Sequence, residues 1–151
     1  MSHCVTCDLL RRRDEGQAPV WDSIHRTLYW DVVHCNNISL PGWLILIVRR
    51  HIAAVDEMTE EEAVEAGKLM RRVSLALKHH TGCTKTYIVQ FAEAPGHHHV
   101  HFHIIPRLPN QSDDLTGPNI FKLLGVPAEE RVEEVIMNHI ALDIRRSLHE
   151  T

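Results

Sequence analysis

Three histidines occupy alternate positions near the middle of the chain, in the segment His99-Val100-His101-Phe102-His103. Alternate residues of a β-strand point to the same face, so this spacing predicts a row of imidazoles with apolar side chains behind them. Imidazole can bind a metal ion, carry a proton near neutral pH or attack phosphorus directly. The central His101 is the best candidate for a nucleophile. We expect His103 to stabilise phosphate charge or protonate a leaving group.

Cysteine and histidine together also indicate a metal site. Histidine makes up 13 of the 151 residues, well above its share in ordinary globular composition. The pair Cys4-x-x-Cys7 supplies half of a four-ligand shell, so two further ligands must come from elsewhere. The alternative is that both are ordinary buried or loop cysteines. Cys35 and Cys83 are isolated and are expected to be core or near-surface thiols.

Residue patterns predict the elements that position these side chains. β-branched and apolar runs indicate strands at residues 27–35, 43–48, 86–91 and 99–105, with Pro106 ending the last. The triad strand is therefore placed within residues 97–106. A capping box begins at Thr59, and the apolar spacing after it predicts a helix that ends near Gly82.

The two ends of the chain differ in pattern. Residues 1–20 carry the two spaced cysteines and otherwise resemble a loop that needs an anchor. Residues 107–119 have the composition of a surface loop. A C-terminal helix is predicted at about residues 128–149, because apolar residues recur every fourth position at Val132, Ile136, Ile140, Ile144 and Leu148. This order of elements predicts one α+β domain, residues 1–151, on an antiparallel sheet.

Length and charge exclude several classes of protein. A hydrophobic fraction of 44% in 151 residues fits one domain with a core. The formal net charge of −4 provides no general attraction to nucleic acid or to an anionic membrane. The longest apolar run, residues 43–48, is far shorter than the ~20 residues needed to cross a bilayer, and the N-terminus lacks a secretory pattern. We therefore expect a cytoplasmic protein with no nucleic-acid or membrane partner.

The motif His-φ-His-φ-His-φ-φ, where φ is apolar, resembles the defining motif of the histidine triad (HIT) superfamily. The following Pro106-Arg107 is similar to the fragile-histidine-triad type. Residues 40–51 resemble the family segment Pro-Gly-His-x-Leu-Val-x-Pro-Lys-x-His, and residues 58–62 resemble its helix start. The resemblance covers residues 4 to about 107. It implies a HIT-like fold of about five antiparallel strands with a long central helix and a C-terminal helix.

The resemblance also implies a reaction. Family members hydrolyse or transfer nucleoside monophosphates from phosphoramidates, dinucleoside polyphosphates or related conjugates. His101 matches the nucleophile that forms a covalent nucleotidyl-histidine, and His103 matches the residue that contacts phosphate and donates a proton. A uridylyl-transferring branch has Gln at this last position, so His103 favours a hydrolase. Gln90 matches a phosphate-contacting glutamine. A non-catalytic nucleotide-binding or metal-binding adaptor is the alternative function.

The same resemblance implies a homodimer and a structural zinc ion. Branches with an N-terminal Cys-x-x-Cys hold zinc at positions that match Cys4, Cys7, His51 and His99. His97 and His98 are alternative fourth ligands.

Three further stretches leave alternatives open. Gly96 stands where the family has a hydroxyl residue, and His97 or His98 is a candidate to take over part of its role. Asn36 and Asn37 lie near a ribose-contacting position but also suit a turn. Residues 11–13 are all arginine and either are solvated or approach a polyphosphate.

Overall fold

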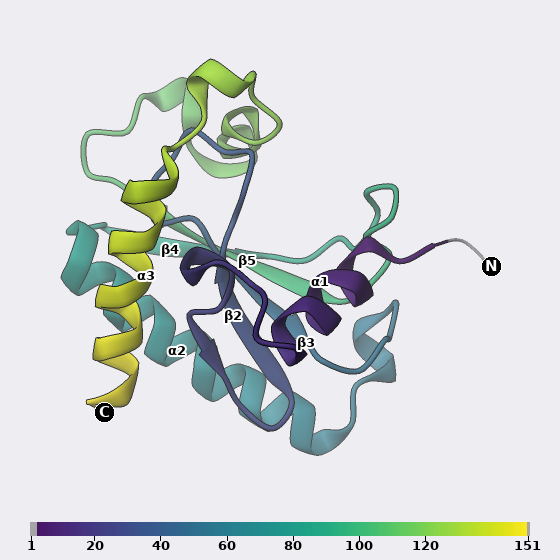
Figure 1. Ribbon diagram of the computed structural model, residues 1–151. Helices are drawn as coiled ribbons and strands as arrows, with labels where there is room; N and C mark the ends of the chain where they lie inside the picture. Colours follow the sequence, from purple (N-terminus) through teal and green to yellow (C-terminus); the bar gives the residue numbers. More distant parts are fainter. Residues whose placement is uncertain (1–2, 151) are drawn as a thin grey trace.

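A five-stranded antiparallel sheet lies at the centre of the computed structural model, which describes residues 3–150 (Figure 1). The strand order is β1-β2-β3-β5-β4, so the strand that carries His101 and His103 lies between two neighbours. This confirms the predicted α+β class. The strands are β1 (His25–Arg26), β2 (Trp30–His34), β3 (Leu44–Val48), β4 (Lys85–Val89) and β5 (His101–Arg107).

The long helix α2 (Glu60–Thr81) follows the predicted start and end signals. The Thr59 hydroxyl accepts a hydrogen bond from the N–H of Glu62, and the Glu62 carboxylate accepts one from the N–H of Thr59. These two bonds satisfy donors that a helix start otherwise leaves unpaired. Gly82 ends the helix at φ 70°, a left-handed conformation that glycine adopts without steric cost.

The two faces of the sheet have different coverings. One face packs its strand residues, including Val32, Leu46 and Ile104, against α2 and the C-terminal helix α3 (Glu134–His149). On the opposite face, Ile45 pairs with His103 and Ile47 pairs with His101. The two triad residues therefore lie on the face away from α2 and α3, because residues paired across strands share a face.

The opposite face is covered by the N-terminal helix at one end and a helical turn at the other. Helix α1 (Val5–Asp14) places Leu10 against Val33 and Ile47. The 3₁₀ turn η4 (Gly117–Leu123) places Ile120 in a second cluster with Trp43 and Ile105. His101 and His103 lie on the strand that runs between these two coverings (Figure 1).

The predicted N-terminal loop was wrong, because residues Val5–Asp14 are helical. Cys4 caps the helix by accepting a hydrogen bond from the N–H of Cys7. Of the basic run, Arg13 is buried and donates to Asp31 and Asp22, while Arg12 also donates to Asp22. Arg11 pairs with Asp8 on the surface. Arg13 therefore joins α1 to the sheet at Asp31, while Arg12, which stays partly exposed, joins α1 to Asp22 of the 3₁₀ turn η1 (Val20–Asp22).

Two other boundaries differ from the sequence prediction. Strand β5 begins at His101 and continues through Pro106, which pairs with Thr86 of β4. Beyond Ile104, β5 has no further registered pair with β3, and a proline is tolerated where a strand is paired on one side. Helix α3 begins at Glu134, after a 3₁₀ turn (Ala128–Glu130), and Ile136 is exposed.

Residues 107–119 contain the 3₁₀ turn η3 (Asp113–Leu115) and the start of η4, and many of their side chains are exposed. Cys35 and Cys83 are both buried, as expected. Within residues 3–150, no helix combines the length and the hydropathy required to span a membrane.

Candidate active site and metal centre

His101 is held in one tautomer by the main chain. Its Nδ1–H donates to the carbonyl oxygen of His99 at 2.6 Å, so the lone pair of the neutral ring lies on Nε2. Burial lowers the pKa of His101 below its usual value, and the hydrogen bond to the His99 carbonyl offsets part of this shift by raising the pKa. The ring is half-buried rather than enclosed. His101 therefore has the two properties that a nucleophilic imidazole needs, neutrality and orientation.

His103 is oriented by a residue that the sequence analysis did not select. The indole Nε1–H of Trp43 donates to Nδ1 of His103 at 2.9 Å, which leaves the ring hydrogen on Nε2. Burial, followed by the charge of His101, lowers the pKa of His103 to about 3. The rings of His101 and His103 lie 5.2 Å apart between centroids. His103 is thus a neutral donor beside the His101 ring.

Trp43 occupies the position of the histidine in the Pro-Gly-His segment that residues 40–51 resemble. The difference between Trp43 and the histidine at that position of the segment is the sequence signal that could have identified Trp43 as a site residue. Phe121 of η4 meets both Trp43 and His103 edge to face, with centroids 5.3 and 5.4 Å away. The His103 side of the site is therefore walled by aromatic rings.

The structure places His99 before β5, with its ring in a different cluster from His101 and His103. The Nε2–H of His99 donates to the carbonyl oxygen of Val48 at 2.7 Å, so Nδ1 carries the lone pair. That Nδ1 faces Cys4, Cys7 and His51, and one ligand atom from each of the four residues lies within 4.8 Å of the others. The predicted set of metal ligands is therefore assembled in the structure.

The distances within this group fit a tetrahedral ion. His99 Nδ1 lies 3.7 Å from Cys4 Sγ, 3.6 Å from Cys7 Sγ and 3.1 Å from His51 Nδ1. His51 Nδ1 lies 3.3 Å from Cys7 Sγ. Zinc bonds of about 2.0–2.3 Å to nitrogen and sulfur give ligand separations of about 3.3–3.8 Å in a tetrahedron. The four residues can therefore hold a metal ion with little rearrangement.

The thiol of Cys7 is harder to ionise than an ordinary cysteine. Burial and the neighbouring Cys4 raise the pKa of Cys7 to about 11. Two adjacent thiolates repel each other, and a divalent cation removes that repulsion when it displaces their protons. Binding of a cation to the Cys–His group would therefore release protons from the thiols and would be favoured by higher pH.

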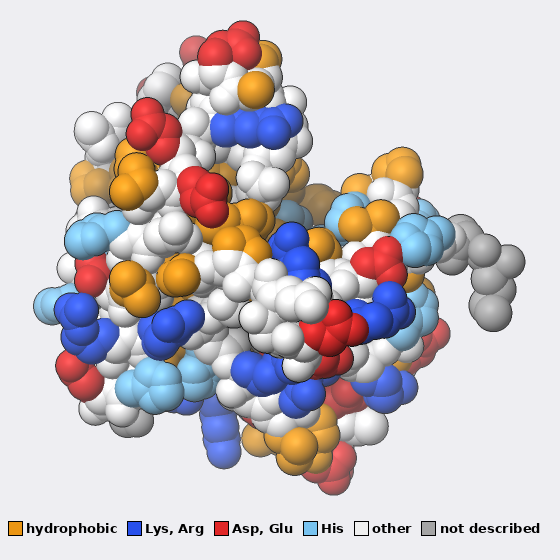
Figure 2. All heavy atoms as spheres, in the orientation of Figure 1, with side chains coloured by type: hydrophobic (Ala, Val, Ile, Leu, Met, Phe, Trp, Pro, Cys, Tyr) orange, Lys and Arg blue, Asp and Glu red, His pale blue; other side chains and the backbone are white. Residues whose placement is uncertain are grey.

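His97 and His98 do not join the Cys–His group. His97 Nδ1 forms a 2.8 Å hydrogen bond with the Thr6 hydroxyl, and burial lowers its pKa. The carbonyl oxygen of Gly96 accepts from the N–H of Val5 at 2.8 Å, while His98 is exposed. The loop before β5 is thus joined to the first turn of α1. Figure 2 shows histidine side chains gathered on the surface over these two segments.

The candidate nucleotide contacts Gln90 and Asn37 lie just after strands, and Gln90 follows Val89, which pairs with His103. Gln90 follows β4, and its Oε1 is buried without a hydrogen-bond partner within residues 3–150. Asn37 follows β2 with φ 61°, the left-handed conformation that suits an asparagine turn, and its carbonyl accepts from Gly125 N–H. This conformation agrees with the turn interpretation for Asn37.

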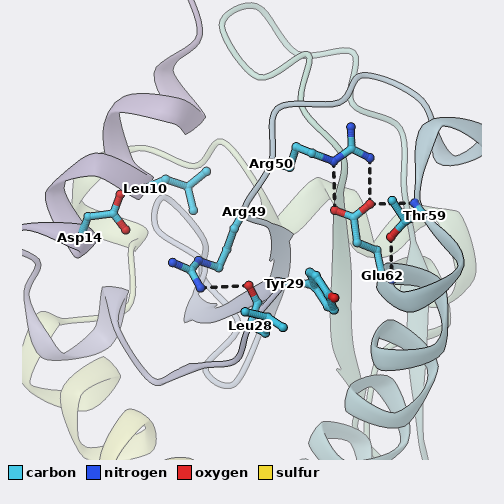
Figure 3. A pocket seen from close by; sticks show the side chains of 8 residues that line it. All are labelled: Leu10, Asp14, Leu28, Tyr29, Arg49, Arg50, Thr59 and Glu62. Carbon is cyan, nitrogen blue, oxygen red and sulfur yellow. Dashed lines mark hydrogen bonds and ion pairs between the residues drawn. The ribbon is translucent and has the colours of Figure 1, made fainter.

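A separate pocket of about 510 Å³ lies beside α1, the turn before β2 and the start of α2 (Figure 3). Arg50 donates to the Glu62 carboxylate and Arg49 to the carbonyl of Leu28. None of its lining residues belongs to the triad or to the Cys–His group. They are Leu10, Asp14, Leu28, Tyr29, Arg49, Arg50, Thr59 and Glu62.

Comparisons with known proteins bear on the fold. Neither a family model nor a curated protein sequence matches the chain. Among solved structures, it is similar to a hypothetical histidine triad nucleotide-binding protein from Sulfolobus tokodaii, with a TM-score of 0.70 and 16% identity over 95% of this chain and 93% of that chain.

Two further structures agree. A Zn-bound histidine triad family protein from Mycobacterium smegmatis has a TM-score of 0.67 and 16% identity, over 97% of this chain and 96% of the other. A histidine triad protein from Bradyrhizobium japonicum has a TM-score of 0.67 and 23% identity, over 83% and 88% respectively. These three histidine triad proteins share the fold of the chain, which confirms the expected fold.

Proposed function

We propose that this chain, a protein with the histidine triad fold, is a nucleotide hydrolase. It would cleave a nucleoside phosphoramidate or a dinucleoside polyphosphate at the α-phosphate and release a nucleoside monophosphate. The observation that carries the proposal is the 2.6 Å hydrogen bond from His101 Nδ1 to the His99 carbonyl. That bond presents the Nε2 lone pair of a neutral ring, as attack on phosphorus requires.

In the first step, Nε2 of His101 forms a bond to the α-phosphorus. The bond from phosphorus to the leaving atom breaks on the opposite side, and its electron pair leaves with that atom. The product is a covalent nucleotidyl-histidine. Positive charge that develops on the ring is offset by the carbonyl oxygen of His99, which already accepts the Nδ1 hydrogen.

His103 would donate a hydrogen bond from Nε2–H to a non-bridging phosphate oxygen. Its ring cannot also release that hydrogen, because Nδ1 already accepts from Trp43 and the pKa of about 3 keeps the ring neutral. A proton for the leaving group would therefore come from water. This revises the proton-donor role expected from the sequence, while keeping the expected phosphate contact.

In the second step, water attacks the phosphorus and the bond to His101 Nε2 breaks. The water proton passes to solvent, the nucleoside monophosphate departs, and the neutral ring is restored. Gln90 would assist by contacting phosphate from the end of β4.

Zinc is the metal that we propose for the Cys–His group, because two sulfur and two nitrogen donors in a tetrahedral arrangement suit it. The structural neighbour from Mycobacterium smegmatis is described as Zn-bound. Cys4, Cys7, His51 and His99 would hold the ion, which supplies an architectural link rather than a reacting centre. Through these four ligands, the start of α1, the segment after β3 and the segment before β5 would be held together.

We also propose that the protein acts as a cytoplasmic homodimer. The strand β4 lies at the edge of the sheet, with one side unpaired in the described chain, and Ile88 on it is exposed. Sedimentation or light scattering would give the mass of the assembly directly. A monomer at micromolar concentration would contradict this part of the proposal.

Trapping the covalent intermediate tests the reaction. The protein is mixed with radiolabelled adenosine phosphoramidate and quenched with alkali, and label is sought on histidine. We expect label on the wild type and on His139→Ala, an exposed histidine of α3 outside the site, but none on His101→Ala. Absence of label, with no turnover across phosphoramidates, dinucleoside polyphosphates and nucleotide sugars, would favour the non-catalytic adaptor.

A further inference from the structure

Phe91 is an exposed aromatic residue next to the triad, with no role in the reaction described so far. Its relative exposure is 61%, although it belongs to the residue class that usually drives burial. Its ring lies 5.7 Å from that of Phe121, and Phe121 lies 5.4 Å from the ring of His103. A continuous row of rings thus leads from the solvent to His103.

The backbone holds Phe91 in this outward position. Phe91 lies two residues after Val89, and Val89 pairs with His103 across β4 and β5. The next residue, Ala92, is buried and has φ 55°, a left-handed conformation that is unfavourable for alanine. Residues in such conformations persist only where the surrounding structure fixes them, and they concentrate at functional sites.

We propose that Phe91 and Phe121 form a subsite for a flat aromatic ring in the leaving group of the substrate. The subsite rests on the proposed function, in which His103 contacts the phosphate from which that group departs. Phe121 is half-buried against Trp43 and His103, so it fixes the inner end, and the exposed ring of Phe91 offers the outer surface. Stacking on aromatic side chains suits any planar ring, including a nucleobase.

Two adenosine phosphoramidates test the subsite, one made with 2-phenylethylamine and one with 2-cyclohexylethylamine. Both leaving groups are primary alkyl amines of similar size, and only the first contains an aromatic ring. Aromatic pairs gain free energy beyond that of area burial, which corresponds to a preference of about threefold to tenfold in kcat/KM. We expect that preference in the wild type, its loss in Phe91→Leu, and its retention in Ile88→Ala, an exposed apolar residue of β4.

Dissociation constants of the two amidates for His101→Ala give a second readout that does not need turnover. The aromatic compound should bind about threefold to tenfold more tightly, and the additional change Phe91→Leu should remove the difference. Equal affinities, no measurable binding of either compound, or a preference unchanged by Phe91→Leu would overturn the subsite. A binding preference without turnover of either compound would instead contradict the proposed hydrolase and leave the subsite supported.

Discussion

The main-chain carbonyl of His99 accepts the Nδ1–H of His101, while the side chain of His99 belongs to the Cys–His group. One residue therefore joins the candidate metal centre to the candidate nucleophile. The His99 ring is itself fixed through Nε2–H by the carbonyl of Val48. Displacement of the Cys–His group should therefore change the orientation of the His101 ring.

Removal of a cysteine ligand should remove the metal and destabilise the fold. Protein purified without metal-affinity resin should contain close to one zinc per chain by elemental analysis, and Cys7→Ala close to none. Because structural zinc contributes directly to folding, the variant should lose several kcal/mol of unfolding free energy, read from denaturant titration. Cys35→Ala, a buried cysteine outside the group, should retain the metal. A metal content near zero in the wild type would eliminate the zinc site.

Loss of the indole donor should impair the reaction more than the fold. Trp43→Phe keeps an aromatic ring but removes the hydrogen bond to His103 Nδ1, so the tautomer of His103 is no longer fixed. A hydrogen bond of this kind is worth about 1 kcal/mol, and we expect kcat/KM to fall by about fivefold to tenfold. The tautomer itself can be followed by the ¹⁵N shifts of the ring.

The matched control is Trp30→Phe. The Trp30 indole donates to the carbonyl of Glu62 on the face covered by α2 and α3. This change should lower stability and leave kcat/KM close to that of the wild type. Equal losses of activity in the two variants would mean that the hydrogen bond to His103 has no special role.

His34 should make the folded state sensitive to acid. Its Nδ1–H donates to the Cys35 carbonyl and its Nε2 accepts from Gly42 N–H, so the ring must be neutral. Burial lowers the pKa of His34 from 6.5 to about 4. Between pH 6.5 and pH 4, His34 is protonated in the unfolded chain but neutral in the folded protein. The contribution of His34 to the free energy of unfolding is therefore fully present above pH 6.5 and is lost as the pH falls toward 4.

The size of this effect follows from the shift. From pH 7 to pH 4.5, His34 should cost the folded state about 2–3 kcal/mol. Denaturant unfolding at both pH values would show a smaller loss in His34→Gln than in the wild type, because other groups contribute equally to both proteins. Identical pH dependence in the two proteins would show that His34 titrates normally.

Arg13 should be far more important for stability than Arg11, two residues earlier on α1. The Arg13 side chain is 3% exposed and bonds Asp31, which is 1% exposed, and Asp22. Without Arg13, Asp31 keeps only its pair with Arg26 and Asp22 only its pair with Arg12, so two buried carboxylates each lose one charged donor. Arg13→Met should therefore cost about 2–3 kcal/mol of unfolding free energy. Arg11→Met breaks only the exposed pair with Asp8 and should cost less than about 1 kcal/mol. Comparable losses would show that the buried network carries little energy.

The sequence permitted prediction of the elements with local signals. The capping box at Thr59 and the glycine at 82 predict α2, and the apolar run 43–48 predicts β3, which the structure places at Leu44–Val48. The Cys–His group was also expected, although only through the resemblance, since nothing in the spacing of residues 4, 7, 51 and 99 shows that they meet.

Elements whose stability depends on distant partners were not predicted. Helix α1 carries one buried leucine, and its other anchors are Arg13 and the contacts of Cys4 and Thr6 with residues 97 and 99. Such contacts leave no periodic apolar pattern in the sequence. Likewise, the donor role of Trp43 depends on the register of β3 with β5, which places it beside His103.

The contact between Cys4 and His99 also bears on the order in which the protein is made. It joins residues 95 positions apart, so every residue between them must leave the ribosome before the first turn of α1 can contact His99. Contacts of such long separation close late because the intervening chain must first be ordered. Until then the thiols of Cys4 and Cys7 stay unprotected, and a newly synthesised chain would be most vulnerable to oxidation and proteolysis in this segment.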